Sequence, residues 1–131
     1  MDKHPLFSIQ GPSTGAIEGP HIHDIGSNLL LALTLDDDGR IRKNEILFVK
    51  TRAIRQRNEP YCTSWHVKDA YDTVCEVQPS SWVVELLGDS HLSRKDEFVL
   101  RHFIIYLDSF GCLEVVAESA RLLPDDSNGD R

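Results

Sequence analysis

A pattern near the end of the chain restricts its fold more than any other. Residues 98–107 are rich in Phe, Val, Ile and Tyr, and residues 112–118 alternate between apolar and polar side chains. The turn Asp108–Gly111 separates the two segments and ends in a glycine, which readily adopts a positive φ. Two β-favouring segments around such a turn predict an antiparallel hairpin.

The second arm of this hairpin predicts which of its faces is buried. Leu113, Val115 and Ala117 share one face, because side chains alternate along a strand. We expect that face to turn towards a core. Glu114 and Glu118 lie on the other face and are expected to contact water, so the hairpin is interpreted as scaffold.

Other segments predict further strands and one helix. Strands are expected at residues 22–28, 29–35, 46–55 and 71–77, and a helix is expected at residues 81–87. Ser80 or Ser81 can cap that helix, and Gly88 can end it. The acidic sequence Asp36–Gly39 predicts a type I turn closed by glycine.

Short strands in series, joined by tight turns, determine the expected fold class. We expect a mainly β protein, an antiparallel β-sandwich or partly open barrel of about six to eight strands with one short helix. The alternative is an α+β fold in which one helix packs on an antiparallel sheet. The 131 residues fit one domain. We expect a flexible N-terminal arm (1–20), a β-rich domain (21–123) and a disordered acidic tail (124–131).

Three features of the chain bear on its environment. The longest apolar run, Leu29–Leu33, is far shorter than the ~20 residues that a membrane span needs. The N-terminus lacks the apolar core of an export signal. The three cysteines are an odd and sparse set, so we expect reduced thiols, with Cys75 and Cys112 filling the core. Together these features predict a cytoplasmic protein without membrane contact.

Charge is distributed unevenly along the chain. Residues 40–57 contain seven basic residues and one acidic residue, a net charge of +6, whereas the rest carries −13, for a total of −7. A basic segment of this kind is typical of an anion contact, or of a solvated strand face paired with acidic neighbours. Alternation would place Arg55 and Arg57 on one face and Lys50 and Arg52 on the other. The negative total disfavours nucleic acid as a partner.

The segment Tyr61–His66 is dense in reactive and aromatic side chains but lacks the periodicity of a strand, so we expect a loop or a single turn. Cys62 and His66 are four residues apart and could pair as thiolate and imidazole on a helical turn. Nothing places Cys62 at the N-terminus of a helix, as a reactive thiolate often requires. The aromatic side chains instead predict a lid over the sheet or an interaction surface.

His21 and His23 alternate along an expected strand, which places both imidazoles on one side, about 6–7 Å apart. Neutral imidazole is a common zinc ligand, so a zinc-type site is one hypothesis. A third ligand is missing nearby, since Ser27 stands where a glutamate would be needed. Ligands would have to come from Cys62 or His66. Two surface histidines without a metal are the alternative interpretation.

The sequence contains no Gly-rich phosphate loop, no Gly-x-Ser-x-Gly elbow and no Cys-x-x-Cys pair. It therefore favours a binding protein over an enzyme, and no cofactor is expected unless the histidines hold a metal. The leading hypothesis is a non-enzymatic cytosolic protein whose partner is another protein. The residues expected to bind are Arg52, Arg55, Arg57, Tyr61, Cys62, Trp65 and His66.

A small-molecule or anion pocket, with or without a metal, is the alternative function. It would lie at a sheet end near four side chains: His21, His23, Cys62 and His66. The mouth of a β-barrel is a common position for such a pocket.

Overall fold

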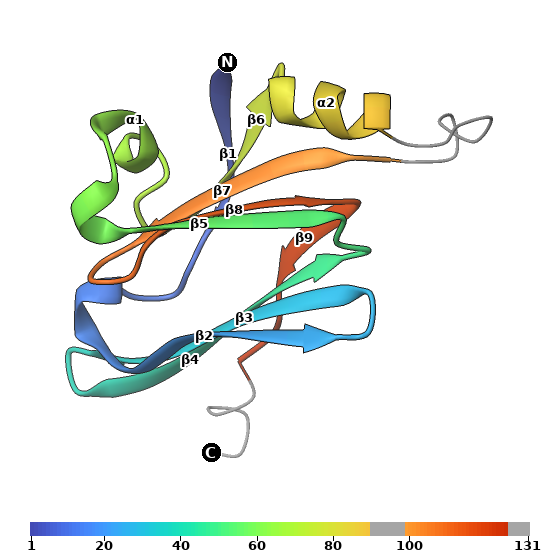
Figure 1. Ribbon diagram of the computed structural model, residues 1–131. Helices are drawn as coiled ribbons and strands as arrows, with labels where there is room; N and C mark the ends of the chain where they lie inside the picture. Colours follow the sequence, from blue (N-terminus) through green and yellow to red (C-terminus); the bar gives the residue numbers. More distant parts are fainter. Residues whose placement is uncertain (90–98, 126–131) are drawn as a thin grey trace.

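The computed structural model describes residues 1–89 and 99–125, which form two antiparallel sheets packed face to face (Figure 1). Sheet A contains, in spatial order, β1 (Asp2–Ser8), β6 (Thr73–Gln78), β7 (Arg101–Leu107), β8 (Gly111–Ala117) and β5 (Ala53–Asn58). Sheet B contains β2 (Ala16–Ile25), β3 (Asn28–Asp37), β4 (Arg40–Val49) and β9 (Ser119–Leu122). The helices α1 (Ser64–Val67) and α2 (Ser81–Asp89) lie over sheet A, and the 3₁₀ turns are η1 (Ser13–Gly15) and η2 (Glu59–Tyr61).

This arrangement confirms the predicted fold class. The protein is mainly β, with two antiparallel sheets, and the described residues form no closed barrel and only one helix longer than a single turn. They contain nine strands, more than the predicted six to eight. The difference arises because residues 1–20 and 119–122 contribute strands, and because residues 46–55 belong to two strands rather than one.

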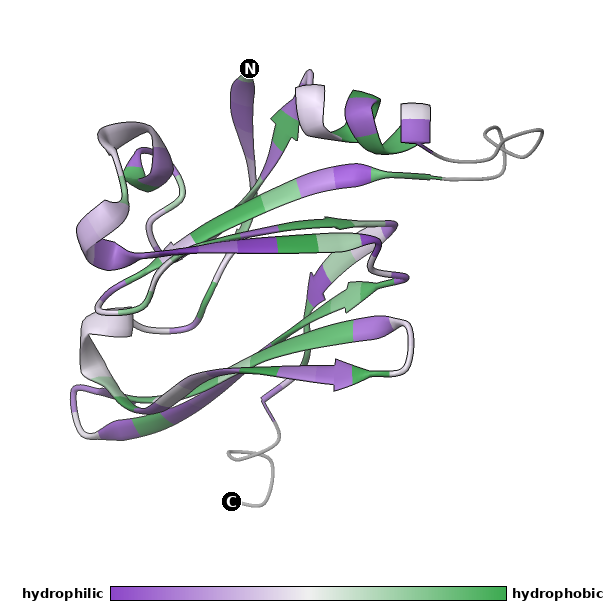
Figure 2. Ribbon diagram, in the orientation of Figure 1, coloured by the Kyte–Doolittle hydropathy of each residue, from purple (hydrophilic) through white to green (hydrophobic). Residues whose placement is uncertain are grey.

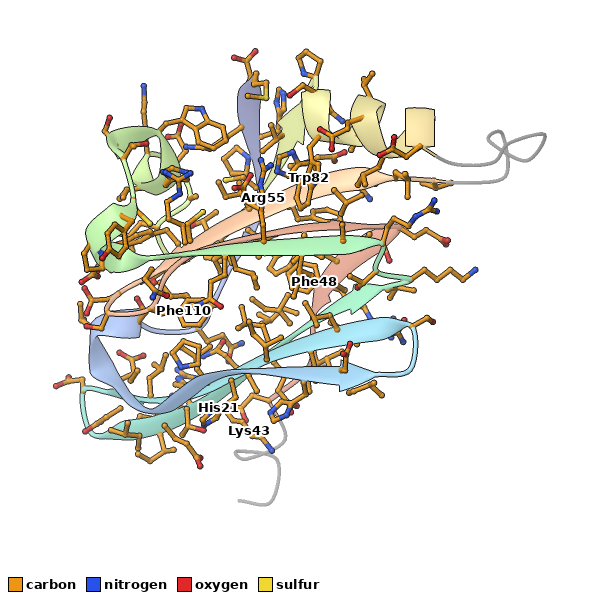
Figure 3. All side chains as sticks on the ribbon, in the orientation of Figure 1. His21, Lys43, Phe48, Arg55, Trp82 and Phe110 are labelled. Carbon is orange, nitrogen blue, oxygen red and sulfur yellow. The ribbon has the colours of Figure 1, made fainter. Side chains whose placement is uncertain are left out.

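The core lies between the sheets, where apolar side chains from both inner faces meet. Figure 2 shows hydrophobic residues along the strands of both sheets. Alternate residues of β3 are buried from Leu29 to Leu35, and the residues between them face outwards. Phe48 of sheet B and Phe103 of sheet A meet across the core, with ring centroids 6.0 Å apart (Figure 3). The predicted inner face of β8 belongs to the same core: Leu113, Val115 and Ala117.

The basic segment crosses from sheet B to sheet A in the middle of its sequence. β4 ends at Val49 and β5 begins at Ala53, so the single strand predicted for residues 46–55 is wrong. Lys50 adopts a positive φ of 52°, and its N–H donates to Asn28 Oδ1 at 2.9 Å. This bend redirects the chain between the sheets, and hydrophobic periodicity does not encode it.

Residues 1–20 form regular structure, which corrects the expectation of a flexible arm. β1 pairs with β6, and β2 pairs with β3. Ile9 is buried in the core and Phe7 packs against it, so burial stabilises this segment, while its glycines and prolines serve as turns between strands. Residues 126–131 of the predicted tail lie outside the described residues.

Several shorter predictions are confirmed or refined. The helix predicted at residues 81–87 is α2, and the loop or single turn predicted at residues 61–66 contains α1. The turn Asp36–Gly39 connects a hairpin, as predicted. The turn itself spans Asp37–Arg40, and its central residues, Asp38 and Gly39, both have positive φ, which is the type I′ pattern rather than type I.

The outer face of sheet A is covered, which corrects the prediction that Glu114 contacts water. The chain must pass over β7 and β8 to connect β5 with β6, and the segment from η2 through α1 makes this connection (Figure 1). Beneath it lies a second apolar cluster that includes Cys75, Ile104 and Cys112. Both cysteines are buried thiols, as expected. Glu114 lies on this covered face and is only 6% exposed.

Gly111 begins β8 at a place where no side chain fits. Its φ is +113°, and a Cβ atom there would lie 2.2 Å from the carbonyl oxygen of Arg57 in the neighbouring strand. Gly39 also has a positive φ, of +86°, but open space surrounds it. A side chain at Gly39 would cause backbone strain alone, whereas a side chain at Gly111 would cause both strain and steric overlap. Comparing the two positions therefore separates these effects.

We expect Gly111→Ala to lower the free energy of unfolding by about 2–4 kcal/mol, because strain and overlap add. Gly39→Ala should cost only about 1–2 kcal/mol, from strain alone. Urea unfolding of both variants checks this prediction. Equal losses would contradict the steric explanation.

Candidate functional site

The outer face of sheet A carries the candidate site, in a cavity lined by residues of β5, β8 and α1. Strand β5 positions two of its side chains by alternation: Arg55 pairs in register with Glu114, and Arg57 pairs with Cys112, all on the covered face. The cavity has a volume of about 320 Å³ and is lined by Met1, Arg55, Gln56, Arg57, Trp65, His66 and Glu114.

Arg55 is held in a fixed orientation at this cavity. Its Nε and Nη2 groups donate to the two carboxylate oxygens of Glu114, at 3.1 and 3.0 Å. Its guanidinium carbon lies 4.1 Å from the ring centroid of Trp82, and Figure 3 shows Arg55 pointing from β5 towards that residue. Bidentate pairing and stacking fix the guanidinium plane, while 52% of the side chain stays exposed.

Glu114 is itself held by a chain of buried hydrogen bonds. His102 Nε2 lies 2.7 Å from Glu114 Oε1, and His102 Nδ1 lies 2.8 Å from Ser80 Oγ. Ser80 Oγ also accepts the backbone N–H of Val83 at 3.1 Å. Because the carboxylate of Glu114 can only accept, His102 Nε2 donates the hydrogen of this contact. This series of hydrogen bonds therefore connects the start of α2 with Arg55.

A serine, a histidine and a glutamate in series are also the groups of a hydrolytic triad. Ser80 is buried, however, and its oxygen caps α2. A nucleophile needs an open approach for the substrate carbonyl. The geometry therefore supports a bridge between α2 and sheet A rather than a nucleophile.

The electrostatics of Glu114 follow from these contacts. Burial raises the pKa of Glu114, but the hydrogen bonds from His102 and Arg55, together with the charge of Arg55, outweigh burial and lower the pKa to about 2. Glu114 is therefore a carboxylate at every ordinary pH, and Arg55 neutralises it.

Arg57 and His66 add two more donors to the cavity. Arg57 Nη1 donates to the carbonyl of Tyr61 at 3.3 Å. His66 Nδ1 accepts the backbone N–H of Thr63 at 2.8 Å, within the capping box of α1. Burial, and then the charge of Arg57, lower the pKa of His66. The ring is therefore neutral at pH 7 and carries its hydrogen on Nε2.

Lys3 of β1 fastens the wall that contains Trp65. Its Nζ donates to the backbone carbonyls of Trp65 and Lys68, at the end of α1. The same ammonium lies 4.3 Å from the ring centroid of Trp65. Burial lowers the pKa of Lys3. The position of the aromatic wall therefore depends on the first strand.

The structure brings four of the seven candidate binding residues to one cavity: Arg55, Arg57, Trp65 and His66. Two others are close by. Tyr61 is highly exposed, and the thiol of Cys62 donates to the carbonyl of Arg57 at 3.3 Å while packing on the second apolar cluster. Arg52 lies apart, where the chain crosses between the sheets, and lines other hollows.

The histidine pair occupies the opposite side of the molecule. His21 and His23 lie on the outer face of sheet B, with ring centroids 6.1 Å apart, and Figure 3 shows His21 there beside Lys43. The fold therefore does not bring them to Cys62 or His66, which lie over sheet A. In residues 1–89 and 99–125, no group of three or more His, Cys, Asp or Glu side chains is arranged to hold a metal ion.

Five residues of the site were not expected from the sequence: Lys3, Ser80, Trp82, His102 and Glu114. The hairpin register contains a signal for two of them. His102 and Glu114 both alternate away from the inner face of the hairpin, and a loop ending at Gly111 places them on neighbouring strands of one face. Nothing in the sequence indicates that α2 covers that face.

Acid should remove the stabilisation that Glu114 provides. Its folded-state pKa of about 2 lies below the ordinary value of 4.5, so the contribution is complete above pH 4.5 and is lost as the pH falls towards 2. The shift corresponds to about 3 kcal/mol. We expect urea unfolding between pH 6 and 2 to show this loss of stability. In the Glu114→Gln variant, the free energy of unfolding should depend less on pH over the same range.

Glu118→Gln is the matched control for this experiment, because Glu118 follows the same strand but is partly exposed, at 41%, beside Lys50. It should keep the acid dependence of the unchanged protein. The role of Glu114 would be refuted by an equal flattening in both variants.

Among the described helices, none combines the length and apolar character needed to cross a membrane. A scan against protein-family models, and searches of curated proteins and of solved structures, found no match for this chain. The chemistry of the site is therefore the basis for assigning a function.

Proposed function

We propose that this chain is a non-enzymatic, cytoplasmic binding protein that recognises an anionic group of its partner in the cavity on the outer face of sheet A. The orientation of Arg55 is the observation that carries this proposal. Its guanidinium is fixed by Glu114 and Trp82, yet half of the side chain is exposed at the cavity. A preorganised arginine loses little entropy when it binds a carboxylate or a phosphate.

Arg55 retains hydrogen-bonding capacity for a ligand. A guanidinium has five N–H donors, and Glu114 takes up two of them. The remaining donors can meet the oxygens of a carboxylate or a phosphate, which match the planar guanidinium.

The local charge also favours an anion. The charges of Arg55 and Glu114 cancel, so the cavity has a net positive charge, which Arg57 supplies. His66 adds a neutral N–H donor, and Trp65 supplies an apolar wall. The chain as a whole carries −7, so recognition depends on this local arrangement and not on the overall field.

The buried position of Ser80 supports binding rather than hydrolysis, as does the saturation of Glu114 by three hydrogen bonds. A general acid or base needs a pKa near the working pH. Glu114, with a pKa of about 2, is far from that range.

Intrinsic fluorescence provides a direct test, because the chain has two tryptophans and both flank the site. Titration with inorganic phosphate and with succinate should change the tryptophan emission in a saturable way. Arg57→Gln should weaken this binding about tenfold, because it removes the positive charge of Arg57, which is not neutralised by Glu114.

Arg40→Gln is the matched control, since it makes the same change at an exposed position in sheet B. It should bind both anions as tightly as the unchanged protein. The proposal fails if neither anion gives a saturable response, or if the two variants weaken binding equally.

A further inference from the structure

Strand β5 forms an open edge of sheet A beside the cavity. It pairs with β8 on one side, and no strand in the described residues pairs with its other side. Its register runs without a shift from Ala53 to Asn58, and the residues from Ile54 onwards are exposed. An exposed edge presents backbone donors and acceptors to another strand.

The other edge strands of the described sheets are less suited to pairing. β1 contains Pro5 and a register shift at that position. β2 contains two register shifts and Pro20 within its length. β9 has only four residues. Proline, bulges and short length are among the protections of an edge, and β5 has none of these. Charged side chains are another protection, and the two arginines of β5 repel a basic strand but attract an acidic one.

A hollow lies on each side of β5. The cavity already described lies on the outer side, at Arg55 and Arg57. On the inner side, a second hollow of about 340 Å³ is lined by Leu29, Ala53 and Ile54, among others. Side chains of an added strand alternate between two faces, so one strand on this edge would reach both hollows.

The charge of β5 selects the occupant. A second copy of this chain, paired through the same edge, would bring its Arg55 and Arg57 against those of the first, and like charges across strands are destabilising. An acidic strand would instead place carboxylates opposite both arginines. An apolar residue of that strand, next to the carboxylate opposite Arg55 and directly opposite Ile54, would cover Ile54, which is 45% exposed.

We propose that an extended segment of another protein adds to β5 as a further strand. Acidic residues at alternate positions face Arg55 and Arg57, and the apolar residue opposite Ile54, next to the acidic residue that faces Arg55, covers Ile54. This inference rests on the proposed anion-binding function, and it specifies the partner as an acidic peptide in β conformation. Main-chain hydrogen bonds supply affinity and the two hollows supply specificity, as in other cases of β-strand addition.

Calorimetry with a short capped peptide in which glutamate alternates with valine tests the inference. It should bind about tenfold more tightly than a scrambled peptide of the same composition. Two further peptides carry N-methyl groups on one or the other set of alternate backbone nitrogens. Only the set that faces β5 should abolish binding, because only those N–H groups pair with the edge.

Protein variants separate this inference from the proposed function. Ile54→Thr should weaken peptide binding several-fold and leave phosphate binding unchanged. Ile41→Thr, at a position of similar exposure (47%) in sheet B, should alter neither. Arg57→Gln should weaken both.

The outcomes are distinguishable. Equal binding of the alternating and scrambled peptides, or equal effects of the two N-methylation patterns, would overturn strand addition. If phosphate still binds in that case, the proposed anion site is supported and only strand addition is refuted. Absence of both phosphate and peptide binding would refute the site and the strand together.

Discussion

The buried carboxylate of Glu114 organises the outer half of the molecule. It accepts hydrogen bonds from His102 on the neighbouring strand β7 and from Arg55 on the edge strand β5. Through Ser80 the same network reaches the start of α2, and Trp82 on that helix covers both Arg55 and His102. A buried charge is stable only when it is fully paired, so removing any one partner would leave the others unsatisfied. Sheet, helix and exposed arginine therefore depend on one another.

Much of the fold follows from the sequence, because the strongest patterns are local. The hairpin of β7 and β8, the leucines of β3 and the capped helix α2 each result from alternation, turn chemistry or capping within a short window. The crossing at Lys50 does not, since a single positive φ leaves the apolar pattern on both sides intact. Residues 1–20 illustrate the same limit, because β1 is ordered by pairing with β6, which lies far along the chain.

The candidate site was only half predictable for a related reason. Arg55, Arg57, Trp65 and His66 are conspicuous in the sequence, and the structure brings them to one cavity. Glu114 is not conspicuous, because a glutamate that alternates with apolar residues normally faces water. Its burial is decided by the segment that crosses sheet A and by α2. Coverage of a sheet face is a property of the topology, and strand alternation alone cannot reveal it.

The three crossings between the sheets have a consequence for how the chain folds. β1 and β2, β4 and β5, and β8 and β9 are consecutive strands that belong to different sheets. Neither sheet is therefore built from one continuous stretch of sequence, since β9 of sheet B follows the hairpin of sheet A along the chain. Topologies dominated by such distant pairings fold on the order of milliseconds to seconds. Until β9 pairs with it, one edge of β4 is unpaired. Because β9 is synthesised after β4, the order of synthesis determines how long that edge is exposed.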